Sequence, residues 1–344
     1  MIDRKKYDLI VNAPNVKTGG GFVLLESLLS ELQNSNYRCL LLLNEKLSES
    51  ISPTQNTQIK FISDGLLGRI ENEYFLSLVA GNYSVVLMFG NLPPVFKLKT
   101  NTVLFLQNAY IINKSPLTGF RLSQKIRISI ERFWFSTFKK NVHRYIVQTI
   151  TMKHLLLQVL TAHISIMPFI EFNDNFDSSD NNHEIQFLYP SSGEPHKNHK
   201  NLISAWILLA QAGRFPTLHL TLDELLFPEL TSWIRLQIDR YDLRIINLGY
   251  INDHGEMLYF LKKSKCLIFP STIESFGMPL LEAEHFKVPI LAPELDYVRD
   301  LVVPNEVFDP QSPLSISRAV QRFLGYHYFS EQLTPKAFIA NLFR

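Results

Sequence analysis

Two glutamates that flank a predicted helix start are the residues whose types and spacing most clearly suggest chemistry. Glu274 and Glu282 are separated by the seven residues Ser-Phe-Gly-Met-Pro-Leu-Leu. Pro279 suits the first turn of a helix, where its missing N–H costs nothing. That turn would leave backbone N–H groups free, at Met278, Leu280 and Leu281. Free N–H groups at a helix start bind phosphates, so the stretch predicts an anion site beside two carboxylates.

A lysine and a glycine loop from distant parts of the chain could complete this site. Residues 190–200 form a polar loop that carries Lys197. Gly20 and Gly21 stand between an apolar run and an apolar helical pattern, and glycines allow a backbone to approach a ligand closely. We expect a diphosphate to lie between backbone donors near Gly20 and near Gly277, with Lys197 as its cation.

Each of these residues also has an interpretation without function. Lys197 alone is typical of a solvated lysine at a helix start, and the glycine loop alone is typical of a turn. Glu282 alone is typical of a first-turn carboxylate that interacts with the helix dipole. In the functional interpretation Glu282 stays ionised and binds a ribose diol, while Glu274 lies nearer to the group that is transferred. Their joint placement on one predicted rim favours the functional interpretation.

The elements that must position these residues are alternating strands and helices. Apolar runs predict strands in the first half at 8–13, 37–43, 58–62, 84–89, 102–106 and 145–147. Further runs predict strands in the second half at 185–189, 218–222, 244–248, 264–269, 288–291 and 306–308. Both halves begin with a strand, a glycine-containing loop and a helix. This pattern predicts an α/β fold with two doubly wound, Rossmann-like domains that face each other across a cleft.

A polar, acidic stretch without periodicity separates the two halves and is interpreted as a linker. The expected organisation is an N-terminal domain over 1–170, a linker over 171–183, a C-terminal domain over 184–325 and a tail over 326–344. The predicted strand ends place the chemistry at the cleft, because open parallel sheets bind ligands outside the carboxyl ends of their strands.

Composition narrows the function classes. A net charge of +2 over 344 residues argues against a dedicated nucleic-acid binder, so no nucleic-acid partner is expected. Cys39 and Cys266 fall in predicted buried strands and are interpreted as reduced core residues of a cytoplasmic protein. No membrane-spanning run or signal peptide is predicted. No metal site is expected, because no cysteine or carboxylate stands at ligand spacing beside His196 and His199.

Residues 111–145 are basic and aromatic, and two interpretations of them stay open. Eight lysines and arginines meet a single acid, Glu131, and aromatic residues are interleaved with them. Such a segment can lie on an anionic membrane surface. It can equally be an amphipathic helix that packs on the core with a solvated basic side.

The stretch 269–283, Phe-Pro-Ser-Thr-Ile-Glu-Ser-Phe-Gly-Met-Pro-Leu-Leu-Glu-Ala, resembles the retaining glycosyltransferases of family 4, which have the GT-B fold. Residues 247–251, Asn-Leu-Gly-Tyr-Ile, and the loop over 189–198 are similar to two further motifs of that family. The resemblance is strong over 185–302 and weak before it. In the first half only the glycine loop and Gln107-Asn108 look related.

This resemblance implies a GDP- or UDP-sugar donor on the C-terminal domain, a glycan or lipid-linked acceptor on the N-terminal domain, and no cofactor. It implies that Glu274 contacts the hexose and Glu282 the ribose. Lys197 would stabilise the leaving diphosphate, so Glu274 and Lys197 are the expected catalytic residues. The other expected donor-binding residues are Ser275, Phe276, Gly277, Met278, Pro279, Leu280, Gly20, Gly21, Ser192, Asn198, Asn108 and Gln107.

Three positions depart from the family pattern. Ser192 replaces an arginine of the phosphate loop, Gln107 replaces a histidine near the hexose, and Lys287 stands where a glycine commonly follows the helix. The resemblance implies a retaining hexosyltransferase of bacterial surface polysaccharide synthesis, such as O-antigen, in the cytoplasm or at the inner face of the cytoplasmic membrane. A nucleotide-sugar epimerase on the same fold and a non-catalytic nucleotide-sugar-binding subunit are the alternatives.

Overall fold

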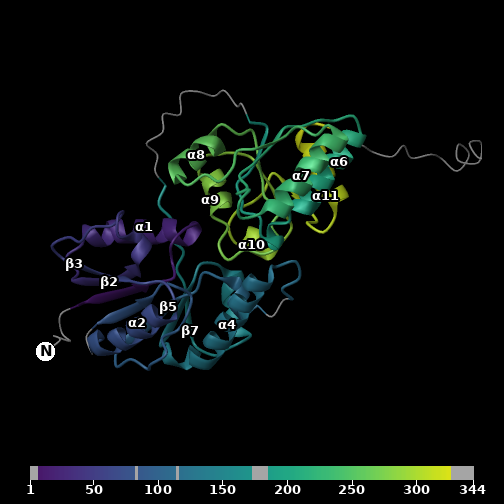
Figure 1. Ribbon diagram of the computed structural model, residues 1–344. Coiled ribbons are helices and arrows are strands. Elements are labelled where there is room, and N and C mark those ends of the chain that lie inside the picture. Colours follow the sequence, from purple (N-terminus) through teal and green to yellow (C-terminus); the bar gives the residue numbers. More distant parts are fainter. Residues whose placement is uncertain (1–6, 82–83, 114–115, 173–184, 327–344) are drawn as a thin grey trace, which may run out of the picture.

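The computed structural model describes residues 7–81, 84–113, 116–172 and 185–326, which form two lobes (Figure 1). Each lobe is built around a parallel sheet, with strands ordered β3-β2-β1-β4-β5-β6-β7 and β10-β9-β8-β11-β12-β13. In both sheets the strand order reverses beside the first strand of the lobe, and such a reversal opens a crevice for ligands. The predicted α/β fold with two doubly wound sheets is therefore confirmed.

The strands of the first sheet coincide closely with the apolar runs of the sequence. They are β1 (Leu9–Ala13), β2 (Cys39–Asn44), β3 (Thr57–Ile62), β4 (Val85–Met88), β5 (Asn101–Phe105), β6 (Arg144–Val147) and β7 (His163–Ile166). Alternate residues of these strands enter two separate buried clusters, because successive side chains of a strand point to opposite faces.

Helices cover both faces of this sheet. The helix α1 (Gly20–Gln33) packs on one face. The opposite face is covered by α2 (Leu66–Val79), α3 (Ala109–Ile112), α4 (Leu122–Phe138) and α5 (Ile150–Leu157). Two short 3-10 turns, Glu45–Leu47 and Lys139–Asn141, complete the first lobe.

The second lobe has shorter strands with the same parallel arrangement. They are β8 (Phe187–Tyr189), β9 (Leu218–Leu220), β10 (Ile245–Asn247), β11 (Leu267–Ile268), β12 (Ile290–Pro293) and β13 (Glu306–Phe308). The helices between and after them are η3 (Pro195–Lys197), α6 (His199–Gln211), α7 (Pro228–Tyr241), α8 (His254–Lys262), α9 (Met278–His285), α10 (Asp296–Arg299) and α11 (Pro313–Phe323).

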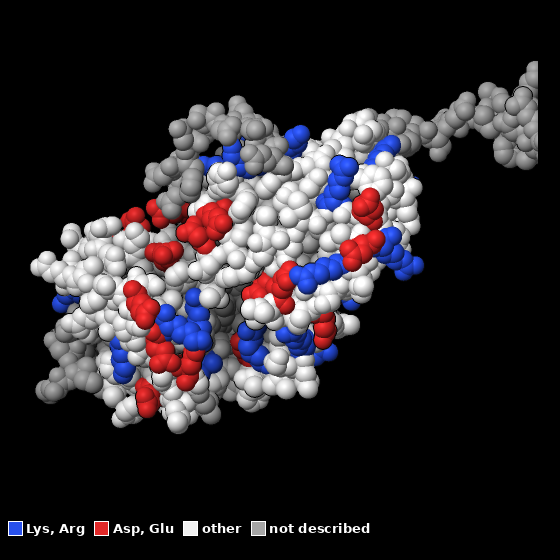
Figure 2. All heavy atoms as spheres, turned by 45° about the horizontal axis from the view of Figure 1, so that its top comes forward, with Lys and Arg blue, Asp and Glu red and all other residues white. Residues whose placement is uncertain are grey.

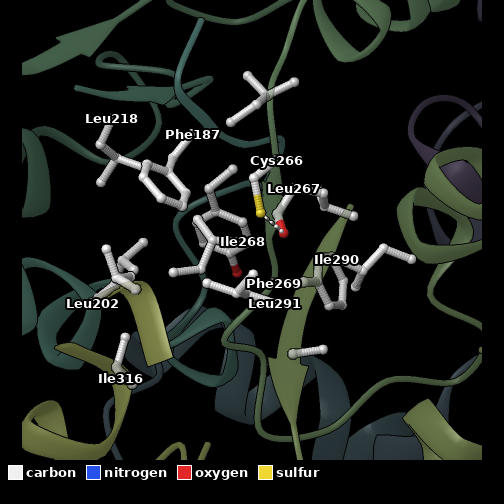
Figure 3. Close-up of a cluster of buried hydrophobic side chains, with 14 of the residues drawn as sticks. Phe187, Leu202, Leu218, Cys266, Leu267, Ile268, Phe269, Ile290, Leu291 and Ile316 are labelled. Atoms are coloured by element: carbon white, nitrogen blue, oxygen red, sulfur yellow. Dashed lines mark hydrogen bonds between the residues drawn. The ribbon is translucent and has the colours of Figure 1, made fainter. Parts of the chain in front are cut away.

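The core of the second lobe surrounds the strand that leads to Glu274. Side chains at 266–269 lie among Leu202 of α6, Ile316 of α11 and the neighbouring strands (Figure 3). Because β11 is buried on both faces, its sequence is a continuous apolar run rather than an alternating one. Cys39 and Cys266 are both buried and free, as expected of core thiols.

Several boundaries differ from the expectation, each for a local reason. The helix α2 begins at Leu66, directly after Gly65, which serves as its N-cap with a φ of 103°. The helix α3 has four residues, too few to show a periodicity, and it was not predicted. The edge strand β7 was missed because exposed residues stand at both of its ends. Most of the expected linker (171–183) and nearly all of the tail (326–344) lie outside the described residues.

On one face of the molecule, charges of both signs are mixed rather than segregated. On the face shown in Figure 2, lysines and arginines are interspersed with acids. Within the residues that the structure describes, no helix has the length and apolar character needed to cross a membrane.

The turn after α9 stores backbone strain at Lys287, which adopts a φ of 60°. A non-glycine residue in this left-handed conformation costs about 1 kcal/mol, whereas glycine adopts it freely. We expect Lys287→Gly to raise the free energy of unfolding by up to about 1 kcal/mol, measured by urea denaturation. The control Lys287→Ala keeps the strain and should not stabilise. A glycine variant no more stable than the alanine variant would show that the turn is unstrained.

Candidate active site

The loop between β11 and α9 carries Glu274 to the crevice at which the strand order of the second sheet reverses. The strand ends at Ile268 and the helix begins at Met278, with Gly277 as its N-cap at a φ of 70°. Pro279 lies in the first turn, as predicted. A side chain at Gly277 would have to be held in a left-handed conformation, so the glycine is required by the backbone.

The two predicted catalytic residues contact each other. The Nζ of Lys197, at the end of the loop after β8, lies 2.6 Å from Oε1 of Glu274. Their side chains are 17% and 12% exposed. Lys197 and Glu274 therefore form a largely buried, charge-assisted hydrogen bond that joins the loops after β8 and β11.

Backbone and hydroxyl contacts hold these two loops in register. The N–H of Thr272 donates to the carbonyl of His196 at 2.8 Å, and the buried hydroxyl of Tyr189 donates to the carbonyl of Lys197 at 2.7 Å. Burial lowers the pKa of His196 to about 4, and the neighbouring Lys197 contributes to this lowering. His196 is therefore uncharged at neutral pH.

Glu282 is buried and bonded to a residue that the sequence analysis did not single out. Its Oε1 lies 2.9 Å from Nε2 of His254, at the start of α8. The hydrogen bond to Glu282 raises the pKa of His254, although burial opposes the rise. Glu282 was expected on the rim of the crevice, and the structure places it with 4% exposure in contact with the imidazole. Only the packing of α8 beside α9 brings His254 to this place, so no local sequence pattern indicates it.

This pair makes stability depend on pH in a defined direction. The pKa of His254 is raised above its ordinary value of 6.5, so the folded state binds the proton more tightly than the unfolded state. The stabilisation is present below pH 6.5 and is lost as the pH rises through the raised pKa. As the pH rises above 6.5, we expect the free energy of unfolding to fall more steeply for the unmodified chain than for His254→Gln. Parallel urea denaturation curves of both proteins test this, and equal pH dependence would contradict the assignment.

One of the expected phosphate donors is already occupied. The N–H of Leu280 donates to the carbonyl of Gly277 at 2.9 Å, and the Leu280 side chain is fully buried. The expectation that this N–H is free is therefore wrong, because the first turn of α9 closes with a tighter i to i+3 bond. The N–H groups of Met278 and Leu281 stay the predicted donors at this helix start.

The apolar residues of the same loop contact the first lobe. Phe276 packs within the buried cluster around α1, and Ile273 packs against the cluster on the other face of the first sheet. The hydroxyl of Ser275 accepts a hydrogen bond from the N–H of Ala109 at 2.9 Å. Ser275 and Phe276 attach the loop to the first lobe, and the role in donor binding that was expected of them stays a prediction.

The glycine loop of the first lobe lies against Met278 and Gln107, which were both expected at the cleft. A Cβ added to Gly20 would lie 3.2 Å from Sδ of Met278, and one added to Gly21 would lie 3.3 Å from Oε1 of Gln107. A side chain at either position would crowd these atoms, so close packing within the protein explains why both residues are glycines. Asn108 caps α3, since its Oδ1 accepts from the N–H of Tyr110.

Two further expected residues make contacts within the second lobe. Ser192 is exposed, and its hydroxyl donates to the carboxylate of Glu194. The amide of Asn198 donates to the carbonyls of Pro270 and Pro310 at 3.1 and 2.7 Å. The side-chain NH2 of Asn198 is therefore engaged within the second lobe. The prediction that Asn198 binds the donor stays open for its side-chain oxygen.

Comparison with known proteins agrees with this geometry. Residues 171–337 match the family model described as glycosyl transferases group 1. The chain is similar to sucrose-phosphate synthase from Thermosynechococcus elongatus, with 15% identity and a TM-score of 0.67 over 92% of this chain and 90% of that one. It is also similar to Anabaena HepE in complex with UDP-glucose, with 16% identity and a TM-score of 0.65 over 92% and 89% of the two chains.

A third similar structure is a mutant of TarM from S. aureus in complex with fondaparinux, alpha-GlcNAc-glycerol and UDP. It shares 16% identity and a TM-score of 0.57 over 74% of this chain and 51% of that one. No curated protein sequence matches the chain.

The two parallel sheets, each with a reversal of its strand order, define the GT-B class of fold. The Lys197–Glu274 pair lies at the point of reversal in the second sheet. Over residues 171–337 the chain matches the group 1 glycosyl transferases, and the protein is a glycosyltransferase.

Proposed function

We propose that the protein is a retaining hexosyltransferase that takes its sugar from a nucleotide diphosphate. The observation that carries this proposal is the contact of Lys197 with Glu274, where the loops after β8 and β11 meet. The scissile bond joins a phosphate to a sugar. A cation suits the phosphate side of this bond, and a carboxylate suits the hydroxyls on the sugar side. The complex of similar HepE with UDP-glucose favours a UDP-sugar as donor.

In the proposed reaction Lys197 stabilises the negative charge that develops on the departing diphosphate. Glu274 accepts hydrogen bonds from hydroxyls of the hexose and so fixes the orientation of the ring. The bond between the anomeric carbon and the phosphate oxygen breaks, while a bond from the same carbon to the acceptor oxygen forms on the same face. The acceptor proton passes to the departing phosphate. Glu282 binds the ribose hydroxyls and shares its carboxylate with His254.

An interdomain cavity offers a place for the acceptor. It has a volume of about 570 Å3 and lies between the start of α4 and the first turns of α6 and α7. Arg121 and Gln124 line it from the first lobe, and Phe227 and Trp233 line it from the second. Aromatic rings beside charged and amide groups suit a sugar, which has apolar faces and polar edges.

A lipid-linked glycan of bacterial surface polysaccharide synthesis is the acceptor class that we propose. One similar structure is a lipopolysaccharide outer core galactosyltransferase, WaaB, with 14% identity and a TM-score of 0.62 over 92% of this chain and 90% of that one. The basic segment 111–145 supports work at the inner face of an anionic membrane. In a flotation assay we expect the protein to float with phosphatidylglycerol vesicles. Failure to float with vesicles of any composition would contradict the proposed membrane association.

A product analysis tests the transfer itself. The purified protein is incubated with UDP-glucose, UDP-galactose or UDP-N-acetylglucosamine, with and without a glycosyl lipid acceptor, and followed by NMR. We expect acceptor-dependent release of UDP and an anomeric configuration equal to that of the donor. An inverted configuration would contradict retention, and a changed sugar from donor alone would indicate an epimerase.

A further inference from the structure

The imidazole of His254 is the group that bonds the carboxylate of Glu282 within the described part of the chain. Its Nε2 lies 2.9 Å from Oε1 of Glu282, and the two side chains are 29% and 5% exposed. A carboxylate only accepts hydrogen bonds, so this contact requires a hydrogen on Nε2. His254 is therefore the donor that fixes one oxygen of a nearly buried acid.

The second oxygen of Glu282 has a different environment. No described residue donates a hydrogen bond to Oε2, although Leu280 and Ala283 on either side of Glu282 are buried in the core. This oxygen is not completely enclosed, so a ligand can reach it. Polar atoms in such surroundings are nearly always hydrogen-bonded, and an unmade bond to a charged group is costly. Oε2 is therefore the oxygen of Glu282 that suits a hydroxyl donor from a ligand.

Acids from both lobes face His254. Glu282 lies on α9, Asp253 is the N-cap of α8, and Glu26 belongs to α1 of the first lobe, on the side of the second lobe that carries α9 (Figure 1). The hydrogen bond to Glu282 raises the pKa of His254 most, burial opposes the rise, and the charges of Asp253 and Glu26 add to it. The carboxylate of Asp253 is engaged, since its Oδ1 accepts from the N–H of Glu256 at 2.7 Å. Glu282 is thus the acid that His254 holds by a hydrogen bond.

A held carboxylate recognises a pair of hydroxyls better than a free one does. The terminal torsion of a glutamate is soft, so without an anchor its two oxygens take many directions. The contact with His254 fixes Oε1 and thereby gives Oε2 one direction. Without this donor, a nearly buried carboxylate also favours its protonated form, which accepts hydrogen bonds less well. Both effects make the recognition of a diol by Glu282 depend on His254.

We propose that His254 is a positioning residue for the nucleotide, which holds Oε1 of Glu282 so that Oε2 accepts hydrogen bonds from the ribose diol. The proposal rests on the proposed function, which gives the ribose hydroxyls to Glu282. His254 itself does not touch the nucleotide in this arrangement. It determines how strongly the site prefers a ribose over a sugar that lacks the two hydroxyls, because that preference depends on an oriented, ionised Glu282.

Calorimetry with UDP and dideoxy-UDP, which lacks both ribose hydroxyls, tests this role on the full-length protein. The unmodified protein should bind UDP at least about tenfold more tightly than dideoxy-UDP, because the analogue leaves a carboxylate oxygen unpaired. In His254→Leu we expect this ratio of affinities to fall below about threefold. His254→Gln keeps an N–H at a similar reach and should restore most of the ratio. His154→Leu, at an exposed histidine of α5, is the matched control and should leave the ratio unchanged.

The ratio of affinities separates positioning from a merely structural role. Damage to the fold weakens both nucleotides alike, whereas a misdirected Glu282 weakens UDP and leaves dideoxy-UDP nearly unchanged. If His254→Leu does not fold, His254→Asn takes its place, because its amide is one methylene shorter than that of the glutamine variant and should not reach Oε1.

An unchanged or larger ratio in the leucine or asparagine variant would overturn the proposal, and so would a glutamine variant no better than these. The pair GDP and dideoxy-GDP is measured in parallel. An unmodified protein that binds neither UDP nor GDP would contradict the proposed donor and this inference together. Binding with the full preference for ribose in every His254 variant would contradict this inference alone.

Discussion

Glu274→Ala is expected to reduce sugar transfer by about 1000-fold or more while the protein remains folded. The carboxylate of Glu274 lies 2.6 Å from Lys197 in a site that is largely shielded from water. Loss of one polar contact to the reacting group in such a site typically costs about 100- to 1000-fold in rate. The variant also frees Lys197 from its partner, which adds a loss of positioning to the loss of the sugar contact.

The experiment compares kcat and KM of purified variants under saturating donor. We expect the loss to fall mainly in kcat, because the contact with the sugar matters most while the glycosidic bond breaks. Glu294→Ala is the matched control, since Glu294 pairs with Arg299 on the surface of the same lobe. Exposed pairs contribute little, so this variant should retain its activity and its melting temperature. Full activity of Glu274→Ala would contradict the assigned role.

A modest loss of stability is expected in the same variant, for a separable reason. Removing one partner of a buried charged pair leaves the other without its hydrogen bond, at a cost of about 1–3 kcal/mol. Glu274→Gln keeps a side-chain carbonyl as acceptor for Lys197 and should be the more stable of the two. If the glutamine variant is stable but inactive, then the charge of Glu274 is needed for the reaction rather than for the fold.

Much of the fold was predictable because buried parallel strands appear as uninterrupted apolar runs. The apolar run at 266–269, which contains β11, is an example, since its side chains are buried and have no polar alternation (Figure 3). The local motif of Gly277 and Pro279 was predictable for a similar reason, because each residue type fits one backbone conformation. Short elements such as α3 were not predictable, since their caps rather than their periodicity define them.

The side-chain contacts within the site were harder to predict from the sequence. Lys197 and Glu274 were both singled out, but their contact joins residues 77 positions apart and depends on how two loops fold. His254 was missed because it reaches Glu282 only through the packing of α8 against α9. The N–H of Leu280 was assigned to a ligand because spacing alone does not show whether a first helical turn closes on itself.

The helix α4 supports one of the two interpretations of the basic segment, and membrane contact stays a prediction. Ile128 and Phe135 are buried, and Phe135 belongs to the core cluster on the first sheet, as a core-facing amphipathic helix requires. Ile130 and Phe133 are exposed, which such a helix alone does not explain. The helix therefore has a second apolar face, and this face is exposed.

Lys197→Met is expected to weaken binding of UDP by about 10- to 100-fold and to reduce kcat/KM by about 1000-fold. Methionine has a similar length without the charge, so the variant removes the cation and keeps most of the packing. The loss in kcat/KM should exceed the loss in UDP affinity, because the negative charge on the diphosphate grows as the sugar departs. Lys200→Met, at an exposed lysine of the first turn of α6, is the matched control and should bind UDP normally.

A double variant decides whether Lys197 and Glu274 act as one unit. Because the two side chains share a hydrogen bond, removal of either already breaks the same contact. The effects on kcat/KM should therefore be far from additive, with the double variant about as impaired as the worse single variant. Fully additive losses would mean that Lys197 serves the phosphate and Glu274 the sugar independently. In that case the contact seen between them would contribute to the fold of the two loops and not to the reaction.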